Sequence, residues 1–167
     1  MTARMNDIIL ILTAITTALI AGLFYAYCCS VNIGLGRLAD KEYIGAMQAI
    51  NAAILNPLFF VSFMGTLVLL PLSAYLTYRD QFLSPQFLLL LSAGVLYLTG
   101  VFGITAFGNV PLNEALANFD LSSATDKAIA GQRIKFESPW VLLHNIRTFV
   151  SVVCLVLVII ACRFKAF

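Results

Sequence analysis

The sequence predicts an all-α protein: an up-down bundle of four transmembrane helices with short amphipathic helices in the two long loops. The first observation is composition, because 61% of the 167 residues are hydrophobic and only 11% are charged. Soluble domains carry about 25% charged residues, so this chain lacks the polar groups that would cover a water-exposed surface. The second observation is a set of four apolar windows, each long enough for the roughly 20 residues of a span.

The four spans belong to one predicted membrane domain that covers the whole chain. They are expected at about residues 8–29, 57–78, 85–107 and 140–162. The first three lie in stretches without any charged residue, at 8–36, 43–78 and 81–113. The first apolar run exceeds the roughly 7–15 residues of a signal-peptide core, and no small-residue cleavage site follows it. We therefore expect the first helix to be retained.

The loop after the first span is predicted to hold an amphipathic helix at residues 40–56. Its apolar stripe has helical spacing and consists of Tyr43, Met47, Ile50 and Ile54. Proline disfavours helical geometry at the residue before it, so Asn56-Pro57 marks a turn before the second span. The short polar connection at residues 79–81 makes the second and third spans antiparallel neighbours.

The loop after the third span is predicted to hold two more short helices. Pro111 cannot continue the third helix but can open a new one. Ser123–Asp126 resembles a capping box and would start a polar helix at residues 124–137. Ser138-Pro139 is typical of the N-cap and first position of the fourth span. From that start, Arg147 would lie about 12 Å along the helix.

Charge indicates how the bundle is oriented. Four spans place both termini on one side of the membrane, where short segments carry Arg4, Arg79, Arg163 and Lys165. Since positive charge in short segments favours the cytoplasmic side, we expect an integral protein of the cell (inner) membrane with both termini in the cytoplasm. The two long loops would then lie outside.

The fourth span carries an ionisable pair. Trp140, His144, Arg147 and Ser151 are spaced by four, three and four residues, so they share one face of a helix. The other faces are aliphatic, as lipid requires. Ionisable side chains are expensive inside a membrane helix and usually mark a functional site.

Further polar residues are predicted at the same end of the bundle, at the start of the second span, the end of the third and the start of the fourth. Asparagines inside a bundle need hydrogen-bond partners, because lipid supplies none. The sequence therefore favours a polar pocket. Alternatives remain open: Asn56 and Asn109 cap helix ends, Trp140 is an interfacial anchor, or Arg147 pairs with Glu114 or Glu42. The pairs Phe24-Tyr25 and Phe59-Phe60 are interpreted as packing or lipid contacts.

Three blocks carry a family resemblance: residues 43–57 with 63–65, residues 109–113, and residues 140–148. They resemble the anthrone-oxygenase-like family of small four-helix membrane proteins. The resemblance implies a four-helix bundle and, from the fungal members, oxidation of an anthrone to an anthraquinone with dioxygen and no obvious cofactor. The polar set that it carries over is Gln48, Asn51, Asn56, Asn109, Asn113, Trp140, His144, Asn145 and Arg147.

The leading hypothesis is a membrane oxygenase that acts on an apolar phenolic or polycyclic substrate. His144 would take a proton from the substrate. Arg147, with Asn51 or Asn109, would hold the resulting oxyanion, and Trp140 would stack on the rings. The alternative is a non-catalytic membrane protein that binds a lipid or quinone, or supports a partner protein. A transporter is a weaker alternative, since a pore built from four spans would need an oligomer.

Cofactors and macromolecular ligands are not expected. The chain has a single histidine, which cannot build a multi-histidine metal site within one subunit. It has no Gly-x-Gly-x-x-Gly motif for a dinucleotide, and its net charge of +2 is too small to indicate nucleic acid. The expected partner is an apolar small molecule or a lipid, and a homo-oligomer is compatible with the sequence.

Overall fold

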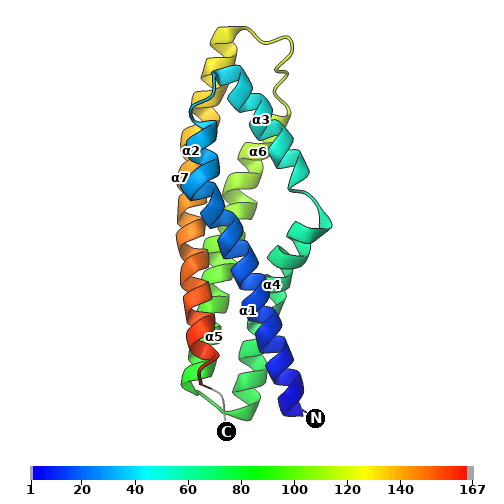
Figure 1. Cartoon of the computed structure of the whole chain (residues 1–167), viewed down its shortest axis with the longest axis vertical. Coiled ribbons are helices and arrows are strands. Elements are labelled where there is room, and N and C mark those ends of the chain that lie inside the picture. The colour runs from blue at the N-terminus through cyan, green and yellow to red at the C-terminus, as the bar shows by residue number, and fades with distance from the viewer. Residues whose placement is uncertain (1, 165–167) are drawn as a thin grey trace.

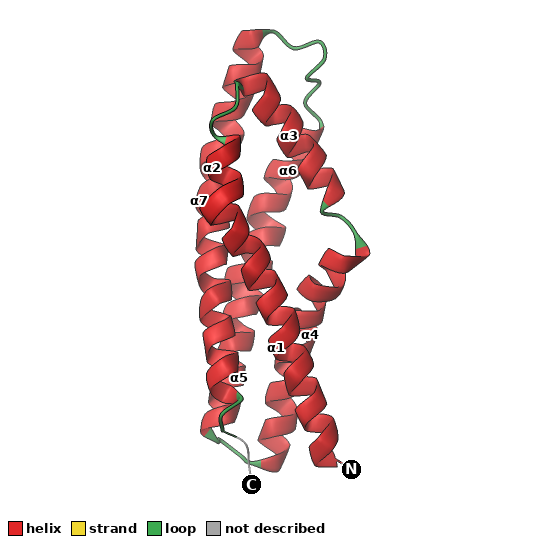
Figure 2. Cartoon of the chain, viewed as in Figure 1, coloured by secondary structure: helices red, strands yellow, loops and turns green. Residues whose placement is uncertain are grey.

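Four long apolar helical segments run along the molecule, and the chain turns back twice at one end and once at the end where the termini lie (Figure 1). The computed structural model describes residues 2–164, with side chains from residue 5 onward. This part of the chain contains helices and loops but no strand (Figure 2). The segments long and apolar enough to cross a membrane are Met5–Leu35, Pro57–Asp80, Pro85–Ala117 and Asp126–Ala161. The predicted all-α class with four membrane-spanning helices is thereby confirmed.

The first helical segment is longer than predicted. It consists of α1 (Thr2–Ala26), a π-helical turn η1 (Tyr27–Val31) and α2 (Asn32–Leu35). The π turn contains one extra residue per turn, so it rotates the side chains that follow it relative to those of α1. Such turns occur frequently at functional sites.

The amphipathic helix forms as α3 (Asp40–Ala53), three residues shorter than expected. It buries Tyr43, Ile44 and Met47 and packs against α6 and α7. Asn56 then caps α4 (Pro57–Asp80), because its side-chain oxygen accepts a hydrogen bond from the backbone N–H of Phe59 at 3.1 Å. The capping alternative for Asn56 is therefore confirmed.

The third segment continues past Pro111 instead of ending before it. α5 (Pro85–Leu96) passes through the π turns η2 (Tyr97–Gly103) and η3 (Thr105–Asn109) into α6 (Val110–Ala117). A short helix does open at Pro111, since α6 has this proline in its first turn, but the predicted break after residue 107 is wrong. At the junction the N–H of Val110 bonds back five residues to the carbonyl of Thr105. This wider turn carries the helix past a proline that has no N–H to donate.

The fourth segment is a single helix, α7 (Asp126–Ala161), of 36 residues. Two predictions are wrong here: Thr125, not Ser123, is the N-cap, and Ser138-Pro139 lies inside the helix. Packing explains the continuity, because Phe136 and Trp140 on either side of the proline belong to one buried cluster. At 1.5 Å per residue α7 is about 54 Å long, well beyond the roughly 30 Å of a bilayer core. A span therefore needs only part of α7, and the apolar part follows its polar first turns.

Two apolar cores divide the bundle along its length. The core towards the termini joins α1, α4, α5 and α7. The core towards the long loops joins α3, α6 and the first half of α7. Residues 2 and 164 lie at the same end of the molecule (Figure 1). Of the charges used to predict orientation, Lys165 lies outside the described residues and the side chain of Arg4 is not described.

Candidate functional site

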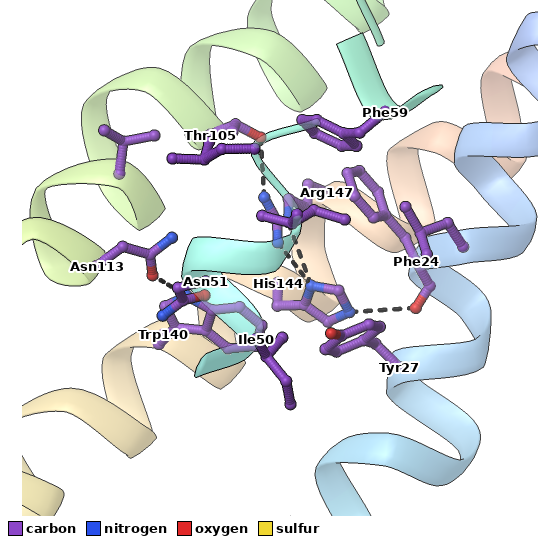
Figure 3. A pocket seen from close by; sticks show the side chains of 14 residues that line it. Phe24, Tyr27, Ile50, Asn51, Phe59, Thr105, Asn113, Trp140, His144 and Arg147 are labelled. Atoms are coloured by element: carbon purple, nitrogen blue, oxygen red, sulfur yellow. Dashed lines mark hydrogen bonds between the residues drawn. The ribbon is translucent and has the colours of Figure 1, made fainter. Parts of the chain in front are cut away.

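A pocket lies where the two cores meet, below α3 (Figure 3). The centre of a water molecule can occupy about 80 Å³ of this pocket. The total empty volume, which includes the open mouth, is about 580 Å³. Its wall is mostly apolar and aromatic. The lining residues are Leu23, Phe24, Tyr27, Ile50, Asn51, Ile54, Leu55, Phe59, Thr105, Val110, Asn113, Trp140, His144 and Arg147.

Arg147 is the charged residue of this wall, and it is 7% exposed. It lies 14 residues before the end of α7, or about 21 Å into the span. Its guanidinium donates to Thr105 Oγ1 at 3.0 Å and lies over the ring of Phe24, 4.4 Å from the centroid. No carboxylate within residues 5–164 pairs with it. The alternative of an ion pair with Glu114 or Glu42 is therefore wrong.

His144 joins Arg147 to the first helix. Its Nε2 lies 3.1 Å from the backbone oxygen of Phe24, so this nitrogen must carry the hydrogen. Its Nδ1 then accepts from Arg147 Nε at 3.2 Å and Nη2 at 2.9 Å. The ring also stacks on Trp140, with 5.0 Å between centroids and 4° between planes. These contacts assign a neutral imidazole whose lone pair points at the guanidinium.

Two asparagines complete the polar part of the pocket. Asn113 accepts from the indole Nε1 of Trp140 at 2.7 Å, which fixes the plane of that ring. Asn51, on α3, has a fully buried Nδ2 with no hydrogen-bond partner in the described part of the chain. An unpaired buried amide is unfavourable, so this group is a candidate to bind something in the pocket.

The other predicted site residues do not line the pocket. Gln48 donates to the carbonyls of Leu116 and Phe119, both at 2.9 Å, and so ties α3 to the end of α6. Asn56 caps α4. Asn109 is buried and donates to the carbonyl of Trp140 at 3.2 Å. Asn145 is exposed and accepts from the thiol of Cys28. The structure thus brings together Asn51, Asn113, Trp140, His144 and Arg147 out of the predicted set.

Several lining residues were not predicted. Phe24 and Phe59, interpreted from the sequence as packing or lipid contacts, lie in the pocket wall. Tyr27 and Thr105 were not singled out at all. The spacing of Phe24 and Tyr27, three residues apart on the first helix, is a signal that could have placed both on one face. Thr105 offered no such signal, since threonines are ordinary in membrane helices.

Potential metal ligands are scattered. No group of three His, Cys, Asp or Glu side chains comes together within residues 5–164. Cys154 is buried, whereas Cys29 is exposed.

A family model described as anthrone oxygenase matches residues 59–157, more than half of the chain. The chain belongs to the anthrone oxygenase family. No curated protein and no solved structure matches it. The matched residues include Thr105, Asn113, Trp140, His144 and Arg147, but the walls that α1, η1 and α3 contribute precede the match.

Proposed function

We propose that this protein is a membrane oxygenase that oxidises an apolar, phenolic polycyclic substrate of the anthrone type with dioxygen. The observation that carries the proposal is the guanidinium of Arg147, buried without a carboxylate in the wall of an aromatic pocket. A buried cation of this kind suits a ligand that develops negative charge. Membership in the anthrone oxygenase family supports the same class of ligand.

The proposed reaction balances without an external reductant. Loss of one methylene proton gives an enolate, whose carbon forms a bond to dioxygen. The peroxide is then protonated, and loss of water from the hydroperoxide leaves a carbonyl. One oxygen atom of dioxygen ends in the product and the other in water, with all the electrons supplied by the substrate carbon. We therefore propose a reaction that needs no bound cofactor.

Arg147 would hold the enolate oxygen. Three of its five N–H groups bond to His144 and Thr105, which leaves two N–H groups for a ligand. His144 has a more restricted role, because its lone pair is already directed at the guanidinium. It becomes available to take a proton when the developing oxyanion draws the N–H groups of Arg147 away. Deprotonation and oxyanion binding are then coupled in one exchange of hydrogen bonds.

Access to the pocket suits a substrate that partitions into lipid. The edge of the pocket includes Leu55, which is 67% exposed, and Val110. Near Leu55 the chain turns away from the bundle between α3 and α4 (Figure 1). An apolar ligand could enter sideways from the bilayer without crossing a polar surface. We further propose that the chain is one membrane domain with cytoplasmic termini in the cell membrane, as the positive charges indicate.

The test is dioxygen consumption by the purified protein in detergent with a panel of anthrones and hydroquinones, corrected for autoxidation. Arg147→Gln is expected to lower kcat/KM about 10²- to 10³-fold, as removal of an oxyanion donor does in other enzymes. Arg79→Gln, an arginine at the far end of the bundle, is the matched control and should leave the rate unchanged. Full activity of folded Arg147→Gln would refute the proposed site.

The variant His144→Gln distinguishes a role of His144 as a base from a role in positioning Arg147. The amide oxygen can still accept hydrogen bonds from Arg147, but an amide cannot take up a proton. If His144 is the base, this variant should bind ligand normally and lose turnover. If turnover persists near the wild-type rate, His144 only positions Arg147 and the coupled exchange is wrong.

The second candidate is a binding protein without turnover, and the same unpaired guanidinium favours it. An anionic lipid headgroup or a quinone oxygen would then occupy the position proposed for the enolate. Mass spectrometry of the purified protein distinguishes the two. A stoichiometric lipid or quinone that is lost in Arg147→Gln, with no oxygen uptake on any substrate, would establish the binding function.

A further inference from the structure

Tyr27 lines the pocket with a ring that carries a hydroxyl, and no group within residues 5–164 forms a hydrogen bond with that hydroxyl. Its ring lies 5.6 Å from that of His144 and 6.4 Å from that of Trp140. Its hydroxyl has no hydrogen-bond partner among residues 5–164 and is not among the fully enclosed polar atoms. Figure 3 shows it turned towards Ile50 and His144, without a dashed line.

A purely packing role does not require this hydroxyl. Phe24, one turn earlier in the same wall, covers the guanidinium of Arg147 with a plain phenyl ring. Tyr27 supplies a similar ring together with a polar group, at the first residue of the π turn η1. An interfacial anchor facing headgroups is the common use of tyrosine in membrane helices. Tyr25 fits that use, since it is 60% exposed, whereas Tyr27 is half-buried and lines the pocket.

The hydroxyl differs in chemistry from the guanidinium. Arg147 can only donate and is charged, so it selects an anionic oxygen. A phenolic hydroxyl both donates and accepts, so it suits a neutral carbonyl or hydroxyl. Asn51 Nδ2, the unpaired donor on α3, shows that unmet hydrogen-bonding capacity in this pocket is not limited to the Arg147 side.

We propose that Tyr27 is a specificity-determining residue that hydrogen-bonds a neutral oxygen of the ligand while Arg147 holds an anionic one. The pocket would accordingly prefer flat aromatic ligands with two kinds of oxygen over those with an anionic oxygen alone. Tyr27 precedes the residues matched to the family model, so the family assignment itself predicts nothing about this position. The inference rests on the proposed ligand site but not on turnover.

The test uses two redox-stable probes with the same carbon skeleton and the same carboxylate: anthracene-2-carboxylate and anthraquinone-2-carboxylate. They differ in two neutral carbonyl oxygens. Binding is followed by quenching of Trp140, which is the single tryptophan of the chain and lies in the pocket wall. The wild-type protein should bind anthraquinone-2-carboxylate more tightly than anthracene-2-carboxylate. In Tyr27→Phe the affinity for the anthraquinone should fall about 3- to 10-fold, the usual effect of one neutral hydrogen bond, with little change for the anthracene.

Tyr25→Phe is the matched control, because it removes a lipid-exposed hydroxyl two residues away. It should leave both affinities unchanged. The proposal is overturned if Tyr27→Phe keeps the wild-type preference, if it weakens both probes equally, or if neither probe quenches Trp140 in wild type. Oxygen uptake is measured separately on the same preparations. Absence of turnover with an intact Tyr27-dependent preference would therefore refute the oxygenase proposal and leave this one standing.

Discussion

Replacing Gly100 by alanine is expected to destabilise the protein by separating η2 from α7. An alanine Cβ at this position would lie 2.8 Å from Val150 Cγ1, 3.1 Å from Cγ2 and 3.3 Å from Cβ. Atoms in proteins rarely approach so closely, and valine is stiff about χ1. Val150 therefore cannot turn its methyl groups aside, so the two helices must move apart.

The magnitude follows from two opposing terms. Overpacking costs about 1–3 kcal/mol, and contact with three atoms of a stiff side chain places Gly100 in the upper part of that range. Replacing a helical glycine by alanine by itself stabilises the folded state by up to about 1 kcal/mol. The net loss is about 1–2 kcal/mol, or a melting temperature lower by about 2–8 °C for a chain of this size. The shift should also lengthen the 3.0 Å bond between Thr105 and Arg147 and lower kcat/KM.

The assay is thermal unfolding in detergent, followed by circular dichroism. Gly131→Ala is the control, because a Cβ there meets nothing within 4 Å, and it should be at least as stable as wild type. Val150→Ala should destabilise less in the Gly100→Ala background than in wild type, since the two changes share one contact. A Gly100→Ala protein as stable as wild type would show that the helices do not pack at the distance described.

Three further changes test other parts of the fold. Asn56→Ala removes the cap of α4 and should lower the free energy of unfolding by about 1 kcal/mol in a denaturant titration. Burial, together with the charge of Glu137, raises the pKa of Tyr43 above its usual 10.0. The folded state therefore holds this proton more tightly than the unfolded state, stability should fall as pH rises above 10, and Tyr43→Phe should flatten that fall in melts recorded across the alkaline range. Arg133 joins α7 to Asp40 at 2.9 Å and to the carbonyl of Leu38 at 2.7 Å. Arg133→Gln should loosen α3 and weaken quenching of Trp140 by anthraquinone-2-carboxylate several-fold.

The fold class was predictable because lipid imposes a simple rule, in which each span needs a long apolar stretch. Two of the errors lie at prolines. Pro111 and Pro139 both occupy contexts typical of a helix start, yet each lies within a continuous helical segment. The local sequence around a proline indicates only that its N–H is missing and that proline is favoured in the first turn of a helix. It does not record the π turn that precedes Pro111 or the buried aromatic cluster that spans Pro139.

The lining of the candidate pocket was predictable where a single helix carries it. The spacing of Trp140, His144 and Arg147 along α7 was enough to place them on one face. Tyr27 and Thr105 come from other segments, and their approach to Arg147 depends on how the helices pack. Not every predicted asparagine lines the pocket, because an asparagine whose side chain bonds only to backbone, such as Asn56, has the same sequence signature as one that faces a cavity.

The hydrogen-bond partners of Arg147 differ from those of an arginine in a structural ion pair. A carboxylate would neutralise the guanidinium but would also compete with any anion entering the pocket. Here the acceptors are neutral, namely Nδ1 of His144 and the hydroxyl of Thr105, and Phe24 covers one face of the charge. These contacts fix the position of the guanidinium and leave its net charge in place. Since a charge retained in an apolar pocket interacts more strongly with an opposite charge than it would in water, the arrangement favours an anion formed inside the pocket, as the proposed enolate would be.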